Sequence, residues 1–190
     1  VIKYFFIWGF IYNLTTIFWI STNIGTNRVV ATLLMILTVL YLSTSTIFIG
    51  LIWYRLKSFF KNYSIIVFAI VWTCVEFIKS YGLLAFPWIS IANTQINYFY
   101  LIQNAEFVGI YGITFWIVIV NGLLYLIIKN KFSYHSILQY VIIFILPFLL
   151  GFIIYYNLNE YDDDYQISII QPNISLEDSR DFSKRFELLD

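Results

Sequence analysis

The sequence predicts an all-α polytopic bundle of membrane helices, followed near its carboxyl end by the start of an α/β domain. Hydrophobic residues make up 61% of the 190 residues and charged residues only 12%, whereas a soluble domain has about 25% charged residues. The charges are also unevenly placed, because nine of the eleven acidic residues lie at or after Glu160. The chain therefore divides into an apolar part, residues 1–157, and a polar part, residues 158–190.

Five apolar stretches are long enough to cross a bilayer. A hydrocarbon core of about 30 Å takes about 17–25 residues of helix, which satisfies its own backbone polar groups where no water is present. We expect these spans at Tyr4 to Ile20, Val29 to Tyr54, Tyr63 to Ile78, Phe107 to Ile128 and Ile137 to Tyr155. Several aromatic residues lie toward the ends of the spans, as is typical of rings at the headgroup level.

Basic residues between the spans predict the orientation of the bundle. Loops rich in lysine and arginine stay in the cytoplasm. Alternation of the spans places six basic residues on one side, namely Lys3, Arg55, Lys57, Lys61, Lys129 and Lys131. Only Arg28 and Lys79 fall on the other side before the polar tail. We therefore predict that the Val1 end is cytoplasmic and that everything after Tyr155 lies outside.

The stretch at about 80–105 is too polar to span a membrane and is unusually aromatic for a loop. We expect it to lie along the outer membrane face as an interfacial segment. Pro87 interrupts any helix there, because it lacks a backbone N–H and restricts Phe86 before it.

The polar tail begins with a hydrophilic linker and then reads QISII at 166–170, bounded by Pro172 and Asn173. This pattern predicts a buried β-strand that ends in a turn. A helix capped by Ser175 or Asp178 is expected after it. Because one strand cannot fold alone and the chain begins at Val1 rather than Met, we expect this sequence to be part of a longer protein.

Glu76 and Glu106 are the only carboxylates in the first 159 residues. Glu76 and Lys79 are three residues apart and share one helix face, near a membrane boundary where an unpaired charge is costly. They can anchor a lipid headgroup or substrate, or they can form an ion pair that only fixes packing. Glu106 opens a span, where the helix dipole favours a negative charge.

The apolar part shows no recognisable catalytic machinery. Cys74 has no base near it in sequence and is expected to be an inert small hydrophobe. A single cysteine and a single histidine predict no metal site, and no cofactor or nucleic-acid partner is indicated. Gly109 and Gly112 are expected to let another helix approach closely.

Four stretches, taken together and in order, resemble one family of bacterial inner-membrane enzymes. They are WGFIYNLTTIFWI at 8–20, VEFIKSYGLLAFPWISIANTQ at 75–95, QNAEFVGIYGITFWIVIVNGLL at 103–124 and SIIQPNI at 168–174. The family they resemble is that of the apolipoprotein N-acyltransferases. The chain departs from the usual family pattern at Lys79, where arginine is common, at Ala85, where glycine is common, and at Pro172, where glycine is also common.

The resemblance implies eight membrane helices and a periplasmic nitrilase-like domain inserted before the last helix. It also implies a Glu, Lys and Cys triad that takes an acyl chain from a phospholipid as a thioester and passes it to the α-amine of a diacylglyceryl-cysteine. All three triad positions are expected beyond Asp190, so this chain alone is expected to be inactive. The implied partners are a phospholipid acyl donor and a diacylglyceryl-modified lipoprotein, and a monomer is expected.

The resemblance places the lipid-facing floor of the enzyme at the aromatic loop. The lipid- or substrate-binding candidates are Phe86, Pro87, Trp88, Glu76 and Lys79. Two alternatives stay open: a transporter or passive membrane scaffold, and a membrane-tethered nitrilase-type amidase. Transporters usually place ionisable groups at the bilayer midplane, and the nearly charge-free spans favour the acyltransferase.

Overall fold

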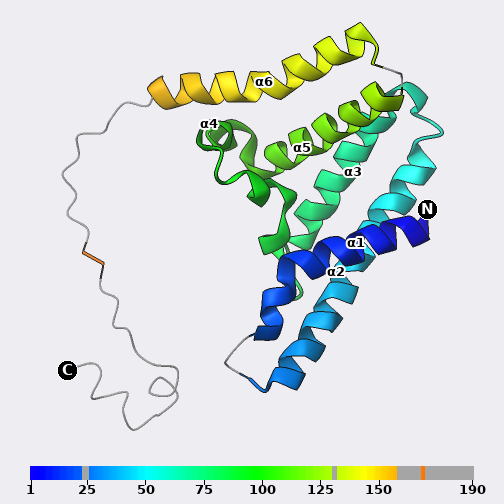
Figure 1. The fold of residues 1–190 in the computed structure, drawn as a ribbon, viewed down its shortest axis with the longest axis vertical. Helices are drawn as coiled ribbons and strands as arrows, with labels where there is room; N and C mark the ends of the chain where they lie inside the picture. The colour runs from blue at the N-terminus through cyan, green and yellow to red at the C-terminus, as the bar shows by residue number, and fades with distance from the viewer. Residues whose placement is uncertain (23–25, 130–131, 158–167, 170–190) are drawn as a thin grey trace.

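The computed structural model describes residues 1–22, 26–129, 132–157 and 168–169. The α-helices are α1 (Ile2–Ile17), α2 (Arg28–Leu56), α3 (Ser64–Lys79), α4 (Phe99–Ile102), α5 (Ala105–Lys129) and α6 (Tyr134–Asn157). Short 3-10 turns are η1 (Phe18–Thr22), η2 (Lys61–Tyr63), η3 (Pro87–Ile89) and η4 (Ile91–Gln95). Figure 1 shows α4 near the carboxyl end of α6, in the connection between α3 and α5 that also contains η3 and η4.

The five predicted spans are confirmed as helices long and apolar enough to cross a membrane. These segments are Ile2–Thr22, Arg28–Leu56, Lys61–Lys79, Ala105–Lys129 and Tyr134–Asn157. The described residues contain no strand, and Ser168 and Ile169 have no regular structure. The rest of the strand predicted at 166–170, and the helix predicted after it, lie outside the described residues.

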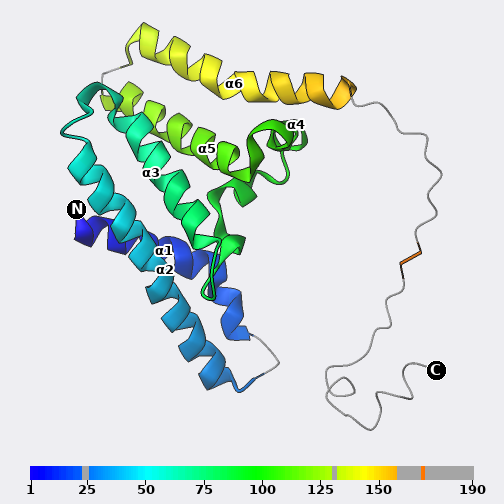
Figure 2. The same ribbon diagram turned by 180° about the vertical axis from the view of Figure 1, so that it is seen from behind.

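The long helices pack in an order that follows the chain. α1 lies along α2, α3 contacts both α2 and α5, and α6 packs on α4 and α5. Figure 2 shows the same neighbours from behind. Lys57, Lys61 and Lys129 line one groove, which shows that the α2–α3 junction and the carboxyl end of α5 meet on the same side. The loop at 80–104 lies at the other end of α3 and α5.

Small and polar residues bring α1 and α2 together. Asn13 donates from Nδ2 to the Gly9 carbonyl at 2.7 Å and contacts Ser43 Oγ at 3.5 Å. Thr46 Oγ1 donates to the Phe5 carbonyl at 3.0 Å. A Cβ added at Gly9 would collide with Thr46 Oγ1. This is the packing mode that membrane helices use where lipid removes the hydrophobic drive to associate.

Gly109 breaks α5 near its start. Its φ of 64° and ψ of 179° are non-helical and lie in a region that is essentially open only to glycine. The expectation that Gly109 and Gly112 admit a neighbouring helix was wrong: a Cβ at Gly109 would meet nothing within 4 Å, and one at Gly112 would meet Val108 of its own helix. The close contact between α3 and α5 lies instead at Gly122, where a Cβ would collide with Ile65.

Pro147 and Gly151 determine how α6 attaches to the bundle. Pro147 has no N–H, so the Ile143 carbonyl lacks its usual helical donor. Trp116 of α5 supplies one, because its Nε1 donates to the Ile143 oxygen at 2.8 Å. Asn104 Nδ2 donates to the Pro147 oxygen at 2.7 Å. A Cβ at Gly151 would collide with the Tyr100 carbonyl, so α6 and the short α4 segment touch through backbone.

Candidate functional site

The candidate site is built around one buried carboxylate. Glu76 lies one turn before the end of α3 and is 6% exposed. Its Oε1 accepts hydrogen bonds from Trp72 Nε1 at 3.1 Å and from the Ile91 backbone N–H at 3.1 Å. Its Oε2 accepts from Ser90 Oγ and Thr114 Oγ1, both at 2.8 Å. A carboxylate has about four acceptor sites, so these donors saturate it.

The four donors come from three segments that are distant in sequence. Trp72 precedes Glu76 by one helical turn on α3 and therefore shares its face. Ser90 lies between η3 and η4, Ile91 begins η4, and Thr114 lies in α5. Ser90 Oγ and Thr114 Oγ1 are also 3.2 Å apart. Glu76 thus joins α3, α5 and the aromatic loop at one point.

Two tyrosines hold the same loop from the first two helices. Tyr12 of α1 donates from its hydroxyl to the Ile89 carbonyl at 3.0 Å, and Tyr41 of α2 donates to the Leu84 carbonyl at 3.2 Å. The Ile89 side chain is buried in a cluster with residues of α1 and α2, namely Ile17, Met35, Val39 and Leu42. Helices α1, α2, α3 and α5 therefore all contribute hydrogen bonds or packing that fix the loop.

The sequence candidates Phe86, Pro87 and Trp88 lie in this loop and differ in exposure. Phe86 packs against the cluster around Ile89, and Pro87 begins η3. Trp88 is 69% exposed, and its ring lies 5.5 Å from that of Phe86, centroid to centroid. Asn93 Nδ2 donates to the Trp88 carbonyl at 2.9 Å. The backbone at Trp88 is held while its indole is presented outward.

The ion-pair interpretation of Glu76 and Lys79 was wrong. Within the described part of the chain no salt bridge joins them, and Glu76 interacts instead with neutral donors. Both residues line a small pocket with a volume of about 10 Å³, together with Tyr12 and Asn13. That volume is close to the minimum for one water molecule. Lys79 itself is half-buried at the end of α3.

The other two groups considered from sequence lie away from this network. Cys74 is exposed on the outside of α3, and Glu106 is exposed in the first turn of α5. The residues that contact Glu76 include no cysteine and no histidine. The arrangement is suited to position a loop, because the Ser90 and Thr114 hydroxyls and the Ile91 amide all donate to the same carboxylate.

Comparison with known proteins decides the family. The family model described as the apolipoprotein N-acyltransferase N-terminal domain matches residues 1–123. The chain belongs to the apolipoprotein N-acyltransferase family. The resemblance seen in the sequence motifs is thereby confirmed. Together with the five apolar helices, this membership makes the chain part of a multi-pass membrane protein of an acyltransferase family.

Individual relatives support the same assignment. The chain is 31% identical over 179 residues to the apolipoprotein N-acyltransferase of Wigglesworthia glossinidia brevipalpis, and the match covers 90% of this chain and 34% of that relative. It is 42% identical over 55 residues to apolipoprotein N-acyltransferase 2 of Treponema pallidum, which covers 29% of this chain and 10% of that protein. A relative from Geobacter metallireducens is 26% identical over 117 residues, or 58% of this chain and 22% of the relative.

The chain thus spans about a third of the length of the Wigglesworthia relative. No solved structure matches it.

Proposed function

We propose that this chain forms the membrane part of an enzyme that transfers a fatty acyl chain from a phospholipid to the N-terminal diacylglyceryl-cysteine of bacterial lipoproteins. Family membership supports the reaction class. In this proposal residues 1–157 form the helix bundle in the bacterial inner membrane. Residues 158–190 form a linker and the beginning of a periplasmic nitrilase-like domain, which holds the Glu, Lys and Cys that react.

The membrane part has a positioning role in this scheme. The thiolate of the downstream domain attacks the phospholipid ester, which forms a thioester and releases the lysophospholipid. The amine of the lipoprotein then attacks the thioester, which forms an amide and releases the thiol. Both substrates carry acyl chains that are buried in the bilayer, whereas the reacting groups lie outside it. A surface at the membrane boundary must therefore hold an acyl chain at a fixed place beneath the soluble domain.

The observation that carries the proposal is an exposed indole on a fixed loop. Trp88 is 69% exposed, yet the next three residues are all tied to the bundle: Ile89 through Tyr12, and Ser90 and Ile91 through Glu76. A tryptophan at this level can lie against an acyl chain while its N–H stays with headgroups or water. The loop therefore presents a large apolar surface with little freedom to move.

The remaining candidates divide by what they touch. Phe86 and Pro87 shape the loop beside Trp88, and they face the lipid with it. Glu76 is saturated by protein donors and acts as a positioning residue. Lys79 has no carboxylate partner in the described part of the chain, and we assign it to a headgroup phosphate on the outer side.

The test compares Trp88→Ala and Trp88→Phe in the full-length protein. Thioester formation from phospholipid and transfer to a diacylglyceryl peptide are measured as separate steps, at equal amounts of folded protein. We expect Trp88→Ala to slow at least one step about 100-fold, because a misplaced substrate can cost that much without any change in the reacting groups. Trp88→Phe keeps an aromatic surface and should retain most of the rate.

The matched control is Trp19→Ala, which removes another exposed indole, 48% exposed, from the turn after α1. It should leave both steps near normal. Slowing of the first step alone would assign the loop to the phospholipid, and slowing of the second alone would assign it to the lipoprotein. Normal rates in both steps for Trp88→Ala would contradict the proposed role of the loop.

A further inference from the structure

A second lipid-sized site has its mouth at the opposite end of the bundle from Trp88. It is a groove of about 880 Å³ between α1, α3 and α5, with the α2–α3 connection at its mouth. We call it the lysine groove and define it by three lysines, Lys57, Lys61 and Lys129, and by the apolar wall of Phe68, Trp72 and Val118. Its volume lies within the range of about 300–1,000 Å³ that is usual for ligand pockets.

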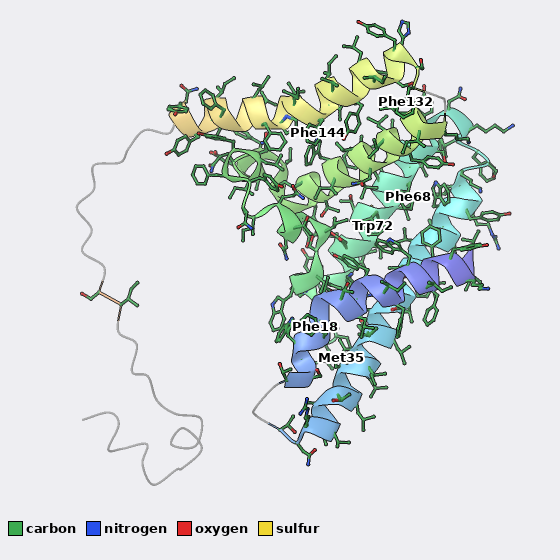
Figure 3. All side chains as sticks on the ribbon, in the orientation of Figure 1. Phe18, Met35, Phe68, Trp72, Phe132 and Phe144 are labelled. Carbon is green, nitrogen blue, oxygen red and sulfur yellow. The ribbon has the colours of Figure 1, made fainter. Side chains whose placement is uncertain are left out.

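The wall of the lysine groove is largely aromatic. The Phe68 ring lies 5.7 Å from that of Trp72 and 5.3 Å from that of Trp53, centroid to centroid. Phe5 of α1 continues this wall at 6.2 Å from Phe68. Figure 3 shows Phe68 and Trp72 on the side of α3 that faces α1 and α2. The wall offers an extended apolar surface of the kind that an acyl chain covers.

The mouth of the groove is positively charged. Lys57 Nζ lies 4.4 Å from the centroid of the Tyr54 ring, and Lys129 Nζ lies 5.9 Å from that of Tyr125. Aromatic faces of this kind hold the ammonium groups near the mouth but do not neutralise them. Lys61 lines the same opening.

The chain before Glu160 provides no carboxylate to balance these lysines. Glu76 and Glu106 are the only two acidic residues there. Glu76 is saturated by its four donors, and Glu106 opens α5, whose other end carries Lys129. The helix has 25 residues, so at 1.5 Å per residue its two ends are up to roughly 37 Å apart.

The described bundle ends with α6 (Tyr134–Asn157), before any of the other acidic residues. This helix begins five residues after Lys129, which lines the groove. Its 24 residues make a helix roughly 36 Å long. The negative charge that pairs with the lysines must therefore come from outside residues 1–157, and the adjoining apolar wall indicates a molecule with both an anionic head and an acyl chain.

We propose that the lysine groove binds one anionic phospholipid. Its phosphate lies at Lys57, Lys61 and Lys129, and an acyl chain lies along Phe68, Trp72 and Val118. Basic clusters beside membrane helices attract anionic headgroups, and basic pockets between such helices bind them specifically. The headgroup end of this site lies away from Trp88, although its apolar wall extends to Trp72 and Ile91, which also donate to Glu76. The proposal does not depend on the proposed reaction.

The test is native mass spectrometry of the detergent-solubilised full-length protein. The protein is titrated with dioleoylphosphatidylglycerol or dioleoylphosphatidylcholine, and individual bound lipids are counted. The key variant is Lys61→Gln with Lys129→Gln. Its control is Lys3→Gln with Arg55→Gln, which removes two charges that do not line the groove.

We expect the wild type to retain one phosphatidylglycerol in preference to phosphatidylcholine. The groove variant should lose about tenfold or more of that preference, because each lysine near an anionic headgroup contributes about fivefold in affinity. The control variant should keep it.

Asn121→Trp supplies a test that leaves the charges unchanged. Asn121 is an exposed residue that lines the groove, and a larger side chain there should displace the acyl chain and weaken the retention of phosphatidylglycerol. Equal retention by the groove variant and the control variant would overturn the proposal. A wild-type protein that retains no anionic lipid would also overturn the proposal. This result is expected if another segment of the full-length protein fills the groove.

Discussion

The hydrogen bonds around Glu76 predict that glutamine replaces this residue well and leucine does so poorly. In Glu76→Gln the amide oxygen can accept from Trp72 Nε1 and the Ile91 N–H, which cannot reverse their polarity. The amide NH₂ then faces Ser90 and Thr114, whose hydroxyls can accept as well as donate. All four hydrogen bonds seen in the structure therefore survive, with two of them reversed.

Glu76→Leu keeps a similar volume but removes the acceptor. Ser90 and Thr114 are 3.2 Å apart and can satisfy each other. The Trp72 indole and the Ile91 amide are left without a partner, at about 1–3 kcal/mol for each buried donor. We therefore expect Glu76→Leu to lower the free energy of unfolding by about 2–6 kcal/mol. For glutamine we expect about 1 kcal/mol or less, because the weaker neutral hydrogen bonds are offset by a lower desolvation cost.

Hydrogen exchange, monitored by mass spectrometry, measures this loss of stability in the loop itself. The Ile91 amide is one of the donors, so peptides that cover 86–95 should exchange about 30-fold faster in Glu76→Leu for a local loss of about 2 kcal/mol. Glu106→Gln is the matched control, because it changes the other, exposed carboxylate and should shift stability by no more than about 0.5 kcal/mol. Equal acceleration of exchange in Glu76→Gln and Glu76→Leu would contradict this prediction. It would mean that the charge of Glu76, and not the hydrogen bonds that it accepts, holds the loop in place.

The attachment of α6 yields two further predictions for the full-length protein. Gly151→Ala should detach α6 from the α4 segment, because the new Cβ meets the Tyr100 carbonyl; a lower thermal midpoint with faster exchange in 134–157 would show this, and a wild-type profile would contradict it. Trp116→Phe should lower the free energy of unfolding by about 1–3 kcal/mol, because the Ile143 carbonyl loses its hydrogen-bond donor. Pro147→Ala restores a backbone donor to that carbonyl. The double variant should therefore lose less free energy of unfolding than the two single variants lose in sum. Strictly additive losses would contradict the pairing of Trp116 with the Ile143 carbonyl.

The positions of the helices could be predicted closely from the sequence. A membrane span needs about twenty apolar residues whatever its neighbours are, so local hydropathy alone located all five segments. The same reasoning identified the 80–105 stretch as different from a span, because Pro87 and its polar neighbours interrupt the pattern.

The contacts of Glu76 could not be predicted in the same way. Ser90 and Thr114 lie 14 and 38 residues from it in sequence, and many Ser and Thr residues in this chain are equally plausible donors. The sequence therefore suggested Lys79, the nearest charge, as one possible partner, beside a role for both residues as an anchor for lipid or substrate. One signal was available: Trp72 lies one turn before Glu76, where an indole N–H can reach a carboxylate.

The role of Gly109 also could not be predicted from the sequence. A glycine can serve either close helix packing or a positive φ, and the sequence does not distinguish the two. The donor that Trp116 gives to the carbonyl freed by Pro147 depends on how α5 and α6 meet, which hydropathy does not specify.

Our central proposal is that the loop around Trp88 lies on the outer side of the membrane and the mouth of the lysine groove on the inner side. Cysteine accessibility in spheroplasts tests both at once. In a Cys74→Ala background of the full-length protein, Trp88→Cys or Lys129→Cys is exposed to a membrane-impermeant maleimide, and the background alone serves as the blank. We predict that the cysteine at 88 is labelled in intact spheroplasts and that the cysteine at 129 is labelled only after permeabilisation. Labelling at 129 but not at 88 in intact spheroplasts would contradict the account.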